Sequence, residues 1–163
     1  MKISNSKVNL VTDTRPTFHD VSDEVRNFLR QSGIINGLVT VYSPHTTCSV
    51  FIQEPSGGKT YNNTFYIMQD LVNVLSKIIP TCTDETQYLH PGRQVEEKHG
   101  IGDFSKFSLN TDAHLRSSIM GRSVSVPVVD GEIQLGNFGH IWFADWDQVR
   151  SREREVLIQV MGE

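Results

Sequence analysis

The chain has 163 residues, of which 37% are hydrophobic and 21% are charged, enough to bury one ordinary core and too few for two large ones. Its 15 Lys and Arg stand against 19 Asp and Glu, so the formal charge of −4 argues against binding to nucleic acid or to an anionic membrane. No apolar run reaches the ~20 residues that cross a bilayer, and the first residues lack the apolar stretch of a signal peptide. We therefore expect a single domain over residues 1–163, located in the cytoplasm.

The first third of the chain predicts strands around one helix. Residues 7–12 are β-branched and partly alternating, which is typical of a strand with one buried face. A helix is expected after Ser22, which can cap its first turn, and Gly33 can end it in the left-handed conformation. Strand character over 38–53 is broken at Pro44, which cannot donate to a ladder, so the next residue, His45, is expected at the break.

The middle of the chain holds the clearest helix. Residues 55–64 favour turns, and apolar residues spaced by three and four then predict a helix over 65–79, which Pro80 ends. Between 81 and 110 the periodicity disappears, and a connection of that length is more often functional than idle. His90 lies in this connection.

The last third predicts a short helix and several strands. Asn110, Thr111 and Asp112 can each cap a helix that carries His114 and ends at Gly121. The pair Asp130-Gly131 between alternating segments predicts a hairpin, since it suits a primed turn. Two more strands are expected over 139–143 and 155–161, joined by a polar turn at 147–154. The element order indicates an α+β fold with mainly antiparallel pairing.

Three histidines are the candidates for metal or acid–base chemistry. His45, His90 and His114 lie at a strand break, in an irregular connection and near a helix start, all placements from which an imidazole can reach a pocket. The alternative for each is a capping, packing or solvated side chain. No pair has the His-Glu-x-x-His spacing of a zinc protease, so the spacing does not assemble a site.

Other polar residues could complete such a site. Glu54 follows a predicted strand, and Asp70 lies at the border of a helix's apolar stripe, so each carboxylate is either solvated or partly buried. The hydroxyls of Thr46, Thr47 and Ser117 could donate to an anionic ligand. Arg150 begins an alternating set with Arg152 and Arg154 that suits a solvated edge, a salt-bridge set or a phosphate clamp.

The two cysteines have no metal-ligand spacing and indicate a reducing compartment. Cys48 lies in an apolar, β-rich segment, which favours a small buried side chain over a reactive nucleophile.

An ordered set of residues spread over nearly the whole chain resembles the YjbQ-like family, also called the secondary thiamine-phosphate synthase family. The set is Ser43-Pro44-His45-Thr46-Thr47, Glu54, Asp70, Pro80, Tyr88-Leu89-His90, Asp112-Ala113-His114-Leu115, Gly121, Pro127-Val128, Gly131, Leu135-Gly136 and Arg150.

The resemblance implies a curved, mainly antiparallel sheet packed with two main helices and a short one, in a homotrimer with pockets near subunit boundaries. It places the family's histidines on His45, His90 and His114, a set that suits zinc or a similar divalent ion. Glu54 and Asp70 match the family's acidic positions, where they could orient an imidazole or act as general base.

The chain departs from the family pattern at two places and carries two apparent insertions. Asn137-Phe138-Gly139 replaces a Thr-Trp-Gln run, and Gln148-Val149 replaces a Gly-Pro turn, which could alter one wall of the pocket. The insertions are 55–64 and 94–108.

Three functions follow from these observations. The resemblance implies a thiamine-phosphate synthase that joins a pyrimidine pyrophosphate to a thiazole phosphate. The second is metal-dependent hydrolysis of a small phosphorylated or acyl substrate, with Glu54 or Asp70 as base. The third is a trimeric protein that binds a metal or small ligand without turnover.

Overall fold

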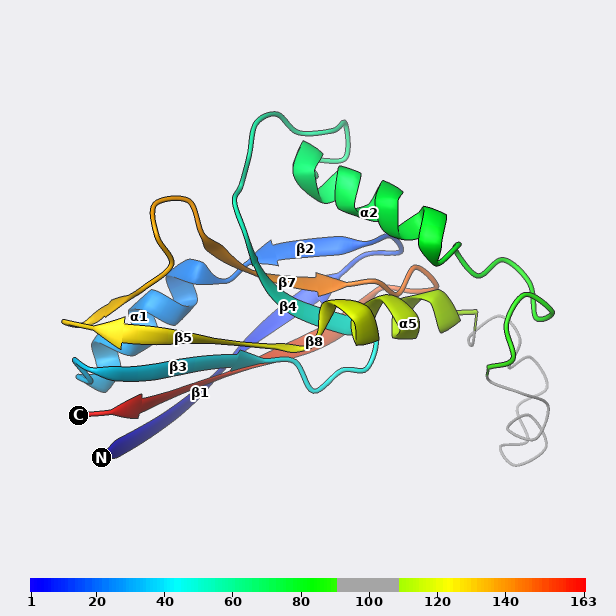
Figure 1. Cartoon of the computed structure of the whole chain (residues 1–163). Coiled ribbons are helices and arrows are strands. Elements are labelled where there is room, and N and C mark those ends of the chain that lie inside the picture. The colour runs from blue at the N-terminus through cyan, green and yellow to red at the C-terminus, as the bar shows by residue number, and fades with distance from the viewer. Residues whose placement is uncertain (91–108) are drawn as a thin grey trace, which may run out of the picture.

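The protein is described here by a computed structural model that covers residues 1–90 and 109–163 (Figure 1). Its elements in chain order are β1 (Lys2–Thr12), β2 (Thr17–Asp20), α1 (Ser22–Ser32), β3 (Gly37–Tyr42), β4 (Cys48–Gln53), α2 (Tyr66–Ile78), α5 (Thr111–Met120), β5 (Ser123–Val129), β6 (Glu132–Ile133), β7 (His140–Asp145) and β8 (Arg152–Gly162).

The strands form two sheets, and three of the connections that lead from one sheet to the other meet at one place. The larger sheet has the order β1-β8-β3-β5-β6 and the smaller has the order β2-β7-β4, with antiparallel pairing throughout. The segments 13–16, 43–47 and 146–151 each lead from one sheet to the other. Asp145 pairs with both Thr17 and Cys48, so the three crossings meet at one end of the smaller sheet. The result is the curled antiparallel α+β fold that was predicted.

Alternation along the strands divides the buried side chains into two clusters. Val39, Val41, Val156 and Ile158 point to one face of the larger sheet, where they pack with α1. The second cluster lies between the smaller sheet and the helices α2 and α5, and includes Trp146. Figure 1 shows α2 lying over β2 and β7, with α5 beside β4 and β5.

The turn chemistry predicted from the sequence is confirmed at two places. Gly33 ends α1 at φ 66°, in the left-handed conformation. Asp130 and Gly131, at φ 52° and 78°, form the turn between β5 and β6, as a primed hairpin turn requires.

Two local predictions are wrong and one strand was missed, because tertiary contacts decide in each case. The N-cap of α1 is Val21, because the Ser22 hydroxyl instead accepts the Ile141 N–H at 2.8 Å. The short edge strand β2 has no strong pattern and was not predicted. The polar turn expected at 147–154 is shorter, because β8 already begins at Arg152, where buried carboxylates pair with its arginines.

Two further predictions concern the long connection after Pro80 and membrane-spanning segments. The middle of the long connection after Pro80, which includes the apparent insertion 94–108, lies outside the described residues. Within the described residues no helix is long and apolar enough to cross a membrane.

Candidate functional site

His45 lies in the crossing between β3 and β4, where backbone bonds fix its ring. Pro44 ends the ladder, and the Cys48 N–H donates to the His45 carbonyl oxygen at 3.1 Å, which closes a turn. The ring Nε2 accepts the Glu155 backbone N–H at 3.0 Å. A neutral imidazole whose Nε2 accepts a hydrogen bond carries its proton on Nδ1. His45 therefore offers Nδ1–H as a donor, and its Nε2 lone pair is already engaged.

Asp145, the last residue of β7, is fully buried at the point where the crossings meet. Its Oδ2 accepts from Thr12 Oγ1 at 2.9 Å and from Arg154 Nε at 2.7 Å. Its Oδ1 accepts from the Asp147 N–H at 3.0 Å and from Thr47 Oγ1 at 3.3 Å. A buried carboxylate is stable only when it is paired and hydrogen-bonded in this way. Asp145 thus fixes the guanidinium of Arg154.

Asp147, two residues after Asp145, is a second buried aspartate that pairs with an arginine of β8. It is fully buried, and its Oδ2 lies 2.7 Å from Arg152 Nη2 and accepts from Asn110 Nδ2 at 3.3 Å. The Nε atom of Arg152 is buried and has no hydrogen-bond partner within the described ranges. A buried N–H that has no acceptor lowers the stability of the folded state. An oxyanion that accepted a hydrogen bond from this N–H would remove that loss.

His90 and His114 lie together at the start of α5. Their ring centroids are 5.1 Å apart at an interplanar angle of 60°. Thr111 Oγ1 donates to the His90 carbonyl oxygen at 3.1 Å and lies 3.0 Å from His90 Nδ1. Because the hydroxyl proton is used on the carbonyl, Nδ1–H must be the donor in the second contact. The Nε2 lone pair of His90 is therefore available.

Some of these groups line one cavity of about 340 Å³ at the crossings. Its lining residues are Pro44, His45, Thr46, Thr47, Asn110, His114, Arg152 and Arg154. His114 lines this cavity together with His45, and its ring also packs against the ring of His90. His114 is therefore the residue that links the other two histidines.

Both cavity histidines favour the neutral state. Burial lowers the pKa of His45, and the Arg154 charge lowers it further. Burial also lowers the pKa of His114, with a smaller contribution from His90, against a hydrogen bond to the Thr46 backbone that favours the cation.

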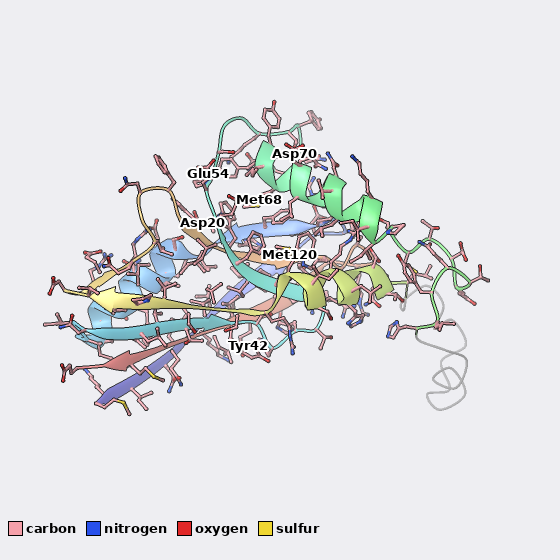
Figure 2. All side chains as sticks on the ribbon, in the orientation of Figure 1. Asp20, Tyr42, Glu54, Met68, Asp70 and Met120 are labelled. Atoms are coloured by element: carbon pink, nitrogen blue, oxygen red, sulfur yellow. The ribbon has the colours of Figure 1, made fainter. Side chains whose placement is uncertain are left out.

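The remaining predicted site residues lie elsewhere. Glu54 and Asp70 are exposed, and Figure 2 shows both near α2, while neither lines the cavity. Ser117 is buried and its hydroxyl donates to the Cys48 carbonyl oxygen, which ties α5 to β4. Arg150 is exposed and does not line the cavity. In the described part of the chain no three His, Cys, Asp or Glu side chains form a metal-binding group, and the three-histidine set stays a prediction.

The sequence reasoning missed the two buried aspartates and Asn110. A signal for the aspartates was present, because the apolar run 141–146 carries Asp145 at a buried position and ends at Asp147. Buried acids need cations, and the alternating arginines of β8 supply them a few residues later. No local pattern indicates that Asn110 faces Asp147.

Comparison with known proteins identifies the family. Residues 6–163 match the family model described as UPF0047 protein YjbQ-like. The chain belongs to this family. It is 28% identical over 158 residues to a UPF0047 protein of Methanothermobacter thermautotrophicus, which covers 97% of this chain and 93% of that protein. It is also 28% identical to the UPF0047 protein YugU of Bacillus subtilis, over 95% of this chain and 97% of YugU.

Solved structures give the same result for the YjbQ-like fold. A protein of Aeropyrum pernix K1 superposes with a TM-score of 0.74 at 28% identity, covering 98% of this chain and 99% of the other. A YjbQ/UPF0047 family protein of Clostridium acetobutylicum superposes with a TM-score of 0.73 at 26% identity, covering 96% and 99%.

The departures from the YjbQ-like pattern do not line the cavity of this family member. Gly139 is required by packing, because a Cβ there would lie 2.2 Å from the Leu135 carbonyl oxygen. Gln148 Nε2 lies 3.5 Å from Asp112 Oδ2, at the buried start of α5. The differences from the family pattern therefore lie outside the lining of this cavity.

Proposed function

We propose that the cavity binds the phosphate group of a small substrate. The observation that carries this proposal is that Arg152, a lining residue of the cavity, has a buried Nε–H with no acceptor in the described part of the chain. Arg154 adds a second guanidinium, and His45 adds its Nδ1–H. Arginine forks held by buried carboxylates are rigid, so little side-chain entropy is lost when an oxyanion binds.

A divalent metal ion, zinc or a similar ion, belongs to the proposal, since the family resemblance implies one. The donor chemistry fits at His90, whose contacts with Thr111 leave the Nε2 lone pair unused, and the His114 ring lies beside it at a centroid distance of 5.1 Å. It does not fit at Nε2 of His45, which already accepts the Glu155 N–H. When bound, such an ion supplies positive charge that stabilises a phosphate leaving group. We therefore assign His90 and His114 to the metal, and His45 to the substrate.

The proposed reaction is the one that the family name implies, thiamine-phosphate synthesis from a pyrimidine pyrophosphate and a thiazole phosphate. Both substrates carry phosphate esters, which suits a cavity rich in cationic and N–H donors. Thr46 and Thr47 lie on its wall, and the Thr46 hydroxyl can donate a further hydrogen bond, whereas the Thr47 hydroxyl already donates to Asp145.

Metal-dependent hydrolysis of a small phosphate ester is the second candidate. It is supported by the same cavity, whose two arginines would hold the phosphate ester, while a bound ion would supply positive charge to the ester oxygens. Glu54 and Asp70 remain the predicted bases for this reaction, although neither lines the cavity. Binding of metal or ligand without turnover is the remaining alternative.

The test measures pyrophosphate affinity by calorimetry in matched variants. Arg152→Lys keeps the charge and removes Nε–H, and we expect it to weaken binding about tenfold. Arg26→Lys, in an exposed pair with Asp23 on α1, is the control and leaves affinity unchanged. Equal affinities in wild type and Arg152→Lys would contradict phosphate binding at this cavity.

Metal content and turnover separate the roles of the histidines. Zinc bound after dialysis is expected to fall in His90→Ala and His114→Ala and to persist in His45→Ala, which loses pyrophosphate affinity instead. Loss of zinc in His45→Ala as well would restore the three-histidine centre. Turnover assays then distinguish formation of thiamine phosphate, release of inorganic phosphate and binding without turnover.

We also propose the homotrimer that the resemblance implies. Ile3, Val129 and Leu157 point outward from the larger sheet and are 52%, 46% and 36% exposed, which supports burial of this face between copies. Sedimentation equilibrium is expected to give three times the 18.4 kDa chain mass, whereas the mass of one chain would refute the trimer.

A further inference from the structure

A second cavity of about 410 Å³ lies against β2 and shares no lining residue with the first. Its walls come from residues 15–20, the loop before α2, and the side chains of Met68 and Trp142. Asp20 and Met68, two of its lining residues, are labelled in Figure 2. We infer that this cavity is a separate binding site for a small organic phosphate that carries a planar ring.

Two cationic side chains give the cavity its preference for an anion. Within the described residues Lys59 pairs with no carboxylate, and its Nζ lies 4.4 Å from the centre of the Phe65 ring. Arg15 pairs with Asp13 through Nε at 3.1 Å, an exposed contact of little strength. The lining carboxylate of Asp20 is already engaged, with His140 Nδ1 at 2.5 Å. A phosphate can therefore approach Lys59 and Arg15 without displacing a strong ion pair.

Aromatic side chains beside the cations give the preference for a planar ring. Phe18 and Phe65 line the cavity and are half-buried. Each ring is held edge-to-face, Phe18 against Trp146 at 5.5 Å and Phe65 against Trp142 at 5.8 Å. The Lys59 ammonium lies over the Phe65 ring, so the cation and the aromatic side chains are neighbours in the cavity wall. A ligand that joins a phosphate to a planar ring could therefore contact both at the same time.

The loop that carries Lys59 is held by its own hydrogen bonds. The Thr60 N–H donates to the Thr64 carbonyl oxygen at 2.8 Å, and the Asn63 N–H donates to the Thr60 carbonyl oxygen at 2.9 Å. Asn63 adopts φ 62°, a left-handed conformation that asparagine tolerates in tight turns. The loop presents the exposed amides of Asn62 and Asn63 at the cavity, where they can bond to the edge of a ring. A preformed loop lowers the ordering cost of binding.

The two tryptophan indoles allow a direct test by NMR on the full chain. Trp142 lines the cavity and its Nε1–H donates to the Gln53 carbonyl oxygen at 3.0 Å, whereas the Trp146 indole bonds to Ser49 and does not line it. The probes are AMP, which joins phosphate to a ring, adenosine and inorganic phosphate. We expect millimolar AMP to shift the Trp142 indole signal and leave the Trp146 signal in place, with about tenfold weaker binding of adenosine and of phosphate.

Matched variants decide the outcome. Lys59→Ala, an exposed substitution, is expected to weaken AMP binding at Trp142 about tenfold, and Lys77→Ala, exposed at the other end of α2, is expected to leave it unchanged. Arg152→Lys should leave the Trp142 response intact, which separates this site from the first cavity. An unmoved Trp142 signal, an equal response in Lys59→Ala, or loss of the response in Arg152→Lys would each overturn the inference.

Discussion

Replacing Asp145 by asparagine tests whether the buried ion pairs hold the site together. The substitution keeps the size of the side chain and lets one oxygen still accept from the Asp147 N–H and from Thr47 Oγ1. The new NH2 group then faces Arg154 Nε and Thr12 Oγ1, which both donate to the lost oxygen. Breaking one partner of a buried pair costs about 3–5 kcal/mol, and we expect a loss of this size in the free energy of unfolding.

Urea unfolding followed by tryptophan fluorescence measures this loss. Asp13→Asn is the matched control, because Asp13 pairs with Arg15 at 3.1 Å on the exposed surface, and it should cost less than about 1 kcal/mol. A loss in Asp145→Asn no larger than that of the control would refute the assignment of Asp145 as the anchor of Arg154.

Three further predictions concern other parts of the molecule. The pKa of His114 is lowered from 6.5 in the folded state, so its contribution to the free energy of unfolding is complete above pH 6.5 and is lost as the pH falls below that value. Urea unfolding from pH 7.5 to 5 should therefore show a smaller loss of this free energy in His114→Asn than in the wild type. Burial, with the Asp145 charge, raises the pKa of Cys48 to about 12. In Cys82→Ser, where Cys48 is the remaining thiol, a thiol reagent at pH 8 should react after urea is added and not before. Rapid labelling of the folded variant would contradict this. Gly37→Ala places a Cβ 2.0 Å from the Met161 carbonyl oxygen and should cost about 1–3 kcal/mol in thermal unfolding, and an unchanged melting temperature would argue against this close approach of β3 to β8.

The fold could be predicted largely from local signals. The apolar stripe of α2, the left-handed Gly33 and the Asp130-Gly131 turn act over a few residues, and each is confirmed. The N-cap of α1 could not be found, because Ser22 bonds to Ile141, more than a hundred residues away. Short edge strands such as β2 depend on the neighbouring strand more than on their own sequence.

The candidate site was predictable in part, because its members come from separate crossings. Pro44 predicts the break that carries His45, but no spacing reveals that Glu155 donates to its ring. The arginines of β8 were noticed as an alternating set, whereas their carboxylate partners lie within an apolar run and meet them only in the folded chain. Pairing between strands that are far apart in the sequence brings these groups together, since Asp145 pairs with both Thr17 and Cys48.

The proposed function requires that a phosphate group binds in the cavity at the crossings. A crystal structure of the protein with inorganic pyrophosphate tests this in one measurement. We predict phosphate oxygens about 3 Å from Arg152 Nε and from His45 Nδ1, within the cavity at the crossings. Pyrophosphate bound elsewhere on the protein, in contact with neither of these two N–H groups, would contradict phosphate binding at this cavity.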